Sequence, residues 1–290
     1  MVFKLPEPWR GISRPRRGSR VIVDITVTFI GNATTLIRGG DITVLTDPNF
    51  LHQGQRAYLG YGLVSKRLRP PALRIDELPP LDAVVLSHMH GDHWDRTAQA
   101  GLDHALPIIT TPHAAKRLHR RGFGKVQGLQ TWQGHTVNTS ATRLTVTALP
   151  GRHAPMPINR LLPPVMGSLL DFVDHASGAG RRLYISGDTL LIDELTEIPD
   201  RFTGIDAGIV HLGGTRLPAG ARLPFGLTVT MDGRQGARAV EVVRLPKVIP
   251  VHFDDYGVFA SPLSEFYVQM ANRGLAERII HIGRGQTITL

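Results

Sequence analysis

The chain has 290 residues, which is long enough for one large α/β domain or two small ones. Hydrophobic residues make up 42% and charged residues 20% of the sequence, a globular balance that excludes a largely disordered chain. The absence of cysteine excludes disulfides and thiolate metal sites, so any metal must bind nitrogen and oxygen ligands. No apolar run reaches the roughly 18–20 residues of a membrane span, and the N-terminus lacks the apolar core of a secretory signal, so we expect a cytoplasmic protein.

The net charge of +9 is compatible with a nucleic acid, an anionic lipid surface or an anionic small molecule as the partner. Apart from a basic arm at residues 1–20 and the segment at 116–125, the basic residues are scattered along the chain. Because this scatter disfavours nucleic acid, we expect an anionic small-molecule substrate. The composition leaves open whether the chain forms a homo-oligomer.

The first half of the chain is predicted to be rich in strands. Alternating β-branched residues predict strands, whereas apolar spacing of three and four residues predicts helices. In chain order we expect a strand at 21–31, a hairpin at 34–48 that turns at Gly39 and Gly40, a long loop at 49–80, a short buried strand at 81–87, and helices at 94–102 and 112–122.

The second half of the chain alternates predicted strands and helices. We expect a strand at 142–149, a hairpin of 168–174 and 181–187, a strand at 205–214, a helix at 231–245 with Asp232 as its N-cap, a strand at 247–252, a helix at 261–274 and a last strand at 277–283. Because helices must cover the apolar faces of sheets, two stacked sheets with helices outside fit this order. No repeat or domain boundary interrupts residues 1–290, and we expect a single domain of the α/β (α+β) class.

The segment "AVVLSHMHGDHWD" at residues 83–95 places three histidines and an aspartate directly after an apolar run. His88 and His90 are two positions apart, which puts two imidazoles on the same side of a strand-like segment. Asp92 and His93 follow after Gly91, which allows the chain to turn. This pattern indicates a metal site rather than histidines that are packed in a core or lie on the surface.

Single histidines and aspartates follow four other predicted strands in the same way. Asp47, His153, Asp188 and His252 each come in the turn just beyond a strand. The ends of strands at one sheet edge are neighbours in space, and sites on rigid scaffolds collect there. Adjacent buried carboxylates are costly without counter-charge, so the pattern predicts two divalent cations with Asp188 between them. Each cation would keep an open position for water.

The segment "SHMHGDHWD" resembles the His-X-His-X-Asp-His signature of the metallo-β-lactamase superfamily, and the four single residues fall in the order of that family's remaining motifs. The resemblance covers about residues 22–290 and implies a four-layer αββα sandwich with a dinuclear metal site. It implies that one metal is held by His88, His90 and His153, and the second by Asp92, His93 and His252, with Asp188 as the bridge. Asp47 resembles the family's aspartate that orients this loop and accepts a hydrogen bond.

The segment "GNATTLIRGGDITVLTDPNF" is similar to the opening of the branch that holds the ascorbate-6-phosphate lactonases and the N-acyl-phosphatidylethanolamine phospholipase D enzymes. Asn32 stands where many members of that branch have a histidine, and Thr230 replaces another of their histidines. Neither is a metal ligand in the family pattern, and we expect both to lie near the substrate, so the substrates of that branch are not transferred to this chain. Asp188 stands where true β-lactamases have a cysteine, which argues against antibiotic hydrolysis.

A water or hydroxide shared by two divalent ions has its pKa lowered from 15.7 toward roughly 7, and it can attack an ester, lactone or phosphodiester at neutral pH. We therefore predict a metal-dependent hydrolase that acts on a small or amphipathic anionic substrate. Asp92 and Asp188 are the catalytic candidates, and Asp188 could also accept the proton of the nucleophile. Zinc is the first expectation for a histidine-rich site, with manganese or iron as alternatives.

Other residues are weaker candidates for contact with the substrate. His211 lies before a Gly-Gly turn at a strand end, where a packed histidine is equally expected. Tyr256 follows the last metal-ligand candidate, although a place in a surface loop is the commoner outcome. The segments at 58–71 and 160–167 can form an apolar rim for an amphipathic substrate, or they can pack as ordinary loops.

Three other functions fit parts of the pattern. A nucleic-acid-processing phosphodiesterase of the same superfamily would explain the sequence pI of about 10.4, but the family's nucleases need a longer insert between Asp188 and His252. A diiron oxidoreductase would need a fused flavin domain, for which this chain is too short. A non-catalytic metal-binding member would be expected to lose ligands, and all seven are present. A metal-dependent hydrolase is therefore the leading prediction.

Overall fold

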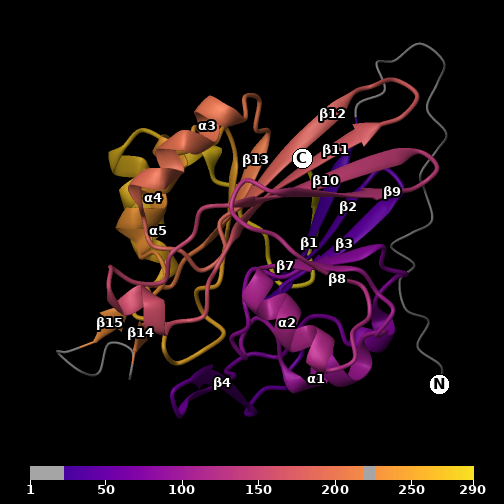
Figure 1. The fold of residues 1–290 in the computed structure, drawn as a ribbon. Helices are drawn as coiled ribbons and strands as arrows, with labels where there is room; N and C mark the ends of the chain where they lie inside the picture. The colour runs from indigo at the N-terminus through magenta and orange to yellow at the C-terminus, as the bar shows by residue number, and fades with distance from the viewer. Residues whose placement is uncertain (1–22, 218–225) are drawn as a thin grey trace, which may run out of the picture.

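The computed structural model describes residues 23–217 and 226–290, so the predicted basic arm at residues 1–20 lies outside the described residues. Two β-sheets lie face to face, and helices cover the outer face of each sheet (Figure 1). This four-layer arrangement confirms the αββα sandwich that the sequence predicts.

Seven strands form the first sheet. In spatial order they are β17 (Thr287–Thr289), β1 (Ile25–Gly31), β2 (Thr34–Gly39), β3 (Ile42–Thr46), β6 (Ala83–Val85), β7 (Ile108–Thr110) and β8 (Val126–Gly128). The first four pair antiparallel, whereas β3, β6, β7 and β8 pair parallel. Since β3 and β6 run side by side in the same direction, the turns that carry Asp47 and His88 are neighbours.

Six strands form the second sheet. In spatial order they are β16 (Val248–Val251), β13 (Ala207–His211), β12 (Gly180–Ile185), β11 (Gly167–Asp174), β10 (Thr142–Leu149) and β9 (Gly134–Asn138). β12, β13 and β16 pair parallel and end at one edge. β10 and β12 are both antiparallel to β11 between them, so β10 ends at this edge as well. His153, Asp188 and His252 follow strands that end there.

The main hydrophobic core lies between the two sheets. Ile37 and Val85 contribute to it from the first sheet, and Val146 and Ile209 contribute from the second. Val84, next to Val85, belongs instead to the cluster under the helices of the first sheet. Because successive side chains of a strand point to opposite faces, the short apolar strand β6 serves both layers, as its continuous hydrophobic run predicts.

The helices bury one apolar side each. On the first sheet lie α1 (Arg96–Gly101) and α2 (Pro112–Arg120), and on the second lie α3 (Ile198–Arg201), α4 (Gly233–Val242) and α5 (Leu263–Asn272). Leu118 and Phe123 are buried beneath the first pair, and Val240 and Phe266 beneath the second group. The side chain of Asp232 accepts a hydrogen bond from the backbone N–H of residue 235, which confirms its predicted role as an N-cap.

Two sequence-based expectations were wrong. The predicted loop at 49–80 contains a two-stranded hairpin of β4 (Arg56–Gly60) and β5 (Leu63–Lys66), followed by a 3-10 turn at Ile75–Glu77. The expected last strand at 277–283 makes only an isolated bridge at Ile279, and β17 is the last strand instead. Ile280 and Ile282 pack against the main core, so their apolar pattern reflects burial without strand pairing.

Shorter elements complete the described residues. They are the strand pair β14 (Arg216–Leu217) and β15 (Leu227–Thr228), and the 3-10 turns at Ile158–Leu161, Asp193–Glu197 and Ala276–Arg278. Among the described residues, no helix combines the length and hydrophobicity that crossing a bilayer requires.

Candidate metal centre

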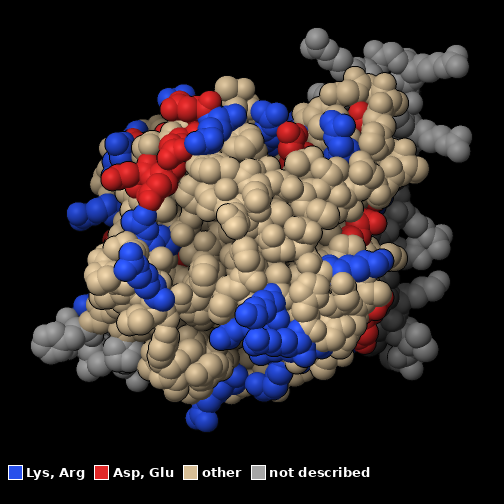
Figure 2. All heavy atoms as spheres, viewed as in Figure 1, with Lys and Arg blue, Asp and Glu red and all other residues tan. Residues whose placement is uncertain are grey.

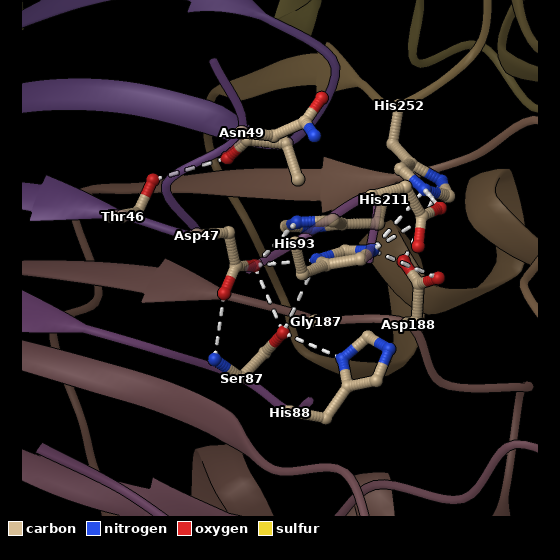
Figure 3. Close-up of polar contacts among 12 residues, drawn as sticks. Thr46, Asp47, Asn49, Ser87, His88, His93, Gly187, Asp188, His211 and His252 are labelled. Carbon is tan, nitrogen blue, oxygen red and sulfur yellow. Dashed lines mark hydrogen bonds and ion pairs between the residues drawn. The ribbon is translucent and has the colours of Figure 1, made fainter. Parts of the chain in front are cut away.

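The structure brings all seven predicted ligands together in two groups at the shared sheet edge. The first group is His88, His90 and His153, and the second is Asp92, His93, Asp188 and His252. Within each group the possible ligand atoms lie within 4.8 Å of one another. The groups adjoin, since the ring centroids of His88 and His93 are 4.2 Å apart. Both groups are buried, and Figure 3 shows His93, Asp188 and His252 converging.

The turn at 88–95 is held in a tight shape by backbone contacts. The N–H groups of His93 and Trp94 both donate to the carbonyl of His90, at 3.0 and 2.8 Å. The N–H of Gly91 donates to the carbonyl of Tyr58 in β4 at 2.9 Å. A Cβ atom on Gly91 would lie 2.7 Å from backbone atoms of Tyr58, so this close approach requires glycine. The β4–β5 hairpin is therefore packed directly on the turn that carries four candidate ligands.

Four of the histidines are oriented by an oxygen atom beside the ring Nδ1. The Nδ1 atoms of His88, His93, His153 and His252 face Ser87 Oγ at 2.9 Å, Asp47 Oδ2 at 3.0 Å, the Val229 carbonyl at 3.2 Å and the Leu212 carbonyl at 3.1 Å, respectively. Carboxylate and carbonyl oxygens accept only, so they assign the proton to Nδ1. The rings of His93, His153 and His252 then present the lone pair of Nε2 to the centre, which is how a metal-bound histidine is normally held, while His88 Nε2 lies 2.8 Å from His90 Nδ1.

Several buried polar atoms of the centre have no hydrogen-bond partner among the described residues. They include His90 Nε2, His153 Nε2, Asp92 Oδ1 and Asp188 Oδ1. In addition, the Nε2 atom of His93 lies 3.3 Å from Nε2 of His252 and 3.2 Å from Asp188 Oδ2, so three possible ligand atoms crowd together. Unpaired buried polar atoms are costly, and divalent cations satisfy nitrogen and carboxylate donors of this kind. The residues present therefore fit a metal site.

The surroundings favour neutral imidazoles in the first group. Burial lowers the pKa of His88 well below its ordinary value, and the neighbouring His93 and His153 lower it further. Burial lowers the pKa of His90 to about 3. The pKa of His153 is also lowered, again mainly by burial. Neutral imidazole is the form that binds metals, so these rings can accept a cation without first losing a proton.

Asp47 stays ionised although it is buried. Burial raises its pKa, but attraction to His93 and hydrogen bonds from His211 and His93 lower the pKa to about 2. Its Oδ1 accepts the backbone N–H of Ser87 at 2.7 Å, and its Oδ2 accepts the Ser87 hydroxyl at 2.9 Å. Asp47 thus orients His93 directly and His88 through Ser87, and Figure 3 shows it on the side of His93 away from Asp188.

His211 and Tyr256, which we considered as contacts to a substrate, are buried and engaged elsewhere. His211 is stacked behind His93 with ring centroids 5.9 Å apart, and its Nε2 lies 3.5 Å from Asp47 Oδ2. The Tyr256 hydroxyl donates to Asn49 Oδ1 at 2.9 Å. Both side chains support the residues around the centre instead of facing the cleft.

Thr230 and Asn32, which we also expected near the substrate, contact candidate ligands from behind. The Thr230 hydroxyl donates to Asp188 Oδ2 at 3.1 Å. The Asn32 side-chain amide donates to the backbone carbonyl of Asp92 at 2.7 Å. Both are completely buried. Thr230 therefore orients the Asp188 carboxylate, and Asn32 holds the backbone at Asp92.

Sequence reasoning missed several supporting residues. Ser87 joins Asp47 to His88, and Asn49 donates to the Gly91 carbonyl at 3.2 Å and to Asp95 Oδ2 at 3.0 Å. Arg67, in the segment predicted to be a loop, is fully buried and donates to the side chain and carbonyl of Asn49. Their places in the sequence could have indicated them, because Ser87 directly precedes His88 and Asn49 lies two residues after Asp47.

A cleft of about 1000 Å³ opens beside His90. Tyr58, Tyr61 and Leu161 line it and are strongly exposed, at 58%, 68% and 68%. Both segments predicted as an apolar rim contribute to it, and the Tyr61 hydroxyl donates to the Leu161 carbonyl across the cleft. The centre is therefore reached through an opening with apolar walls on two sides.

The same cleft is strongly basic. It is lined by five exposed arginines, namely Arg56, Arg96, Arg117, Arg121 and Arg160. Asp95 is the only carboxylate in the described lining, and it is buried and accepts hydrogen bonds from the backbone N–H groups of Phe50, Leu51 and Ala98. Figure 2 shows basic side chains gathered over the region of α1 and α2. The cleft therefore presents positive charge that its own carboxylate does not neutralise.

Comparison with known proteins places this fold in a family. The model of the β-lactamase superfamily domain matches residues 43–253. A UPF0173 metal-dependent hydrolase of Deinococcus radiodurans is 24% identical over 264 residues, which cover 89% of this chain and 97% of the relative.

Two solved structures share the fold. A possible metal-dependent hydrolase from Veillonella parvula, at 23% identity, has a TM-score of 0.74 over 93% of this chain and 100% of its own. An isothiocyanate hydrolase from gut bacteria of Delia radicum, at 20% identity, has a TM-score of 0.71 over 91% of this chain and 98% of its own. These names agree with the predicted hydrolase, while the narrower resemblance to the lactonase and phospholipase D branch stays a prediction. With its family match over most of its length and its two stacked sheets, this chain belongs to the β-lactamase superfamily.

Proposed function

We propose that the protein is a metal-dependent hydrolase whose centre holds two divalent cations. The proposed ligands are His88, His90 and His153 for one cation, and Asp92, His93, Asp188 and His252 for the other. The observation that carries this proposal is the set of buried nitrogen and carboxylate oxygen atoms without hydrogen-bond partners among the described residues, which converge from the ends of β6, β10 and β12. Zinc suits the histidine-rich donor set best, and manganese and iron are compatible with it.

Bound cations would supply Lewis acidity and a water of lowered pKa, which is the chemistry that hydrolysis at neutral pH needs. The protein's own residues would orient the ligands, and its carboxylates would neutralise the charge of the cations. Asp47 beside Nδ1 of His93 favours the tautomer whose Nε2 faces the centre, and Ser87 Oγ holds the ring of His88 by its contact with Nδ1. Asp92 and Asp188 each retain one buried carboxylate oxygen, Oδ1, without a hydrogen-bond partner among the described residues, although Asp188 Oδ1 lies 3.5 Å from His252 Nδ1. We assign to Asp188 Oδ1 the acceptance of the proton that the nucleophile loses.

The proposed substrate is a small or amphipathic anionic ester, lactone or phosphodiester. Five arginines line the cleft, and none pairs with a carboxylate within the described ranges 23–217 and 226–290. The Arg96 guanidinium donates to the carbonyl of Arg56 at 3.2 Å, which fixes it at the cleft wall. Arginine forks match carboxylate and phosphate oxygens, so the cleft supports an anionic ligand beside His90. The apolar rim supports an attached hydrocarbon group.

The proposal is tested by metal analysis of the purified protein together with a panel of lactone, carboxylic ester, phosphomonoester and phosphodiester substrates. We expect close to two metal ions per chain and hydrolysis of at least one class. His90→Ala should lose metal and activity while its circular dichroism spectrum stays native. His52→Ala removes an exposed histidine away from the centre and is the matched control. Undiminished metal content and activity in His90→Ala would contradict the proposal.

A further inference from the structure

Asn32 occupies an unusual backbone position directly after β1. Its φ angle is +53°, in the left-handed region that asparagine and glycine tolerate best. The residue is completely buried, with no exposed side-chain surface. A strained and buried polar residue persists only where surrounding contacts require it. Its hydrogen bonds show what those contacts are.

Asn32 joins two of the loops that carry candidate ligands. Its side-chain amide donates to the Asp92 carbonyl at 2.7 Å. Its own carbonyl accepts the backbone N–H of His252 at 2.9 Å. Asp92 and His252 lie 160 positions apart in the sequence, and their side chains meet with Asp92 Oδ2 at 3.4 Å from His252 Nε2. One residue therefore bonds to the backbone of both members of this pair.

A buried charged cluster fixes Asn32 in turn. The backbone N–H of Asn32 donates to Asp255 Oδ2 at 2.7 Å. Asp255 is fully buried and pairs with Arg284 at 2.9 Å and with Arg67 at 3.5 Å. Buried ion pairs with several hydrogen bonds fix geometry more than they add stability. Asn32 is thus a rigid link between the His252 loop and the turn that contains Asp92.

This link reaches only one of the two ligand groups. Asp92 and His252 both belong to the second group, whereas the hydrogen bonds of Asn32 reach none of His88, His90 and His153. The first group has separate supports, because Ser87 holds His88 and the Val229 carbonyl holds His153. Asp47 supports members of both groups, whereas the hydrogen bonds of Asn32 reach the second group alone.

We propose that Asn32 is a positioning residue for the second cation position alone, acting by setting the separation of Asp92 and His252. This inference rests on the proposed two-cation centre. Loss of a residue that orients ligands typically weakens metal binding by roughly 10- to 100-fold. The weakening should fall on one of the two bound ions and leave the other in place.

Two substitutions distinguish a role of Asn32 in positioning Asp92 and His252 from a general role in folding. Asn32→Gly keeps the left-handed backbone and both backbone hydrogen bonds but removes the side-chain donor. Asn32→Asp keeps the shape and replaces the donor by an oxygen that repels the Asp92 carbonyl. Asn138→Asp makes the same chemical change at an exposed site in β9 and is the control. Full-length, metal-loaded proteins are dialysed against increasing chelator, and metal content and thermal unfolding are measured.

We expect both Asn32 variants to release one ion at a chelator concentration roughly 10- to 100-fold lower than wild type, and to keep the second ion as wild type does. The absorption spectrum of Co²⁺-loaded protein should lose the contribution of one ion only. Equal weakening of both ions, or no weakening in either variant, overturns the role of Asn32. If wild type itself holds fewer than two ions, the proposed centre fails and this inference fails with it, a result that the wild-type titration shows independently.

Discussion

The carboxylate of Asp47 lies 3.0 Å from the Nδ1 atom of His93, although the two residues follow different strands. Since β3 and β6 run parallel side by side, their ends bring this pair together without any long connection. The contact selects the tautomer of His93 and places a buried negative charge behind the ring, which makes Nε2 a stronger ligand.

Replacing Asp47 by asparagine should weaken metal binding while preserving the fold. The amide has one acceptor oxygen where the carboxylate has two, so it cannot serve both Ser87 and His93 as before. We expect metal affinity to fall roughly 10- to 100-fold, measured by competition with a chromogenic chelator. Asp41→Asn, at an exposed turn, serves as the control. Unchanged affinity in Asp47→Asn would show that the ring orientation is set elsewhere.

Removing two cleft arginines should weaken the binding of anions. In Arg117→Gln/Arg121→Gln, the α2 side of the cleft loses two guanidinium groups. We expect the affinity of the metal-loaded protein for phenyl phosphate to fall roughly tenfold or more, because hydrogen bonds between charged groups contribute more binding free energy than neutral ones. Calorimetry measures this affinity.

Lys116→Gln/Arg120→Gln provides the matched control for this prediction. It removes the same charge from exposed positions of the same helix that do not line the cleft. The control should bind phenyl phosphate nearly as wild type does. Equal losses in both double variants would indicate a general electrostatic effect, and no loss in either would exclude an anion-binding role for these arginines.

Adding one methyl group at Gly91 should disturb the centre. The Cβ of alanine would lie 2.7 Å from the backbone N and O of Tyr58, so the turn or the hairpin must shift. We expect Gly91→Ala to lose roughly 1–3 kcal/mol of unfolding free energy and to bind metal more weakly, measured by urea denaturation and metal analysis. Gly124→Ala, where no atom lies within 4 Å of the added Cβ, should behave as wild type. Identical results for the two variants would count against this packing.

Removing the Asp95 side chain should lower the free energy of unfolding more than removing the helix cap at Asp232. It caps α1 through the backbone N–H of Ala98, and it also accepts the N–H groups of Phe50 and Leu51. Asp95→Ala leaves these buried donors without an acceptor, so we expect a loss of roughly 2–4 kcal/mol in urea denaturation. Asp232→Ala removes a cap that serves α4 and should lose only about 1 kcal/mol. A smaller loss for Asp95→Ala than for Asp232→Ala would refute this ranking.

The local sequence pattern was sufficient to predict the layers of the fold and to predict that the candidate ligands lie close together. A continuous apolar run predicts β6 with both faces buried, and the histidines that follow it lie at the sheet edge as expected. The β4–β5 hairpin escaped prediction because glycines interrupt it and apolar residues, Tyr58 and Val64, occupy exposed positions, so its alternating burial is not matched by an alternation of apolar and polar residues. The strands β7 and β8 are only three residues long, which is too short to show an alternating pattern of apolar and polar residues.

Supporting contacts were harder to predict than ligands, because they depend on which loops meet. Asn32, Thr230, Tyr256 and His211 were expected near the substrate, yet their hydrogen bonds run to Asp92, Asp188, Asn49 and Ser186. The sequence alone does not show which residues of a buried polar cluster face the cleft and which lie behind the candidate ligands. The burial of Arg67 was equally hidden, since its partner Asp255 is far away along the chain.

Tyr58 belongs to two surroundings at once. Its side chain is exposed on the wall of the cleft, while its carbonyl receives the N–H of Gly91. Side chains along this hairpin can therefore be exchanged to suit a different molecule in the cleft, but its main chain cannot shift without also shifting the turn that carries the candidate ligands. A change in the molecule that the cleft accepts is therefore expected to come from side-chain substitutions on an unchanged backbone. Insertions or deletions next to Tyr58 should be disfavoured.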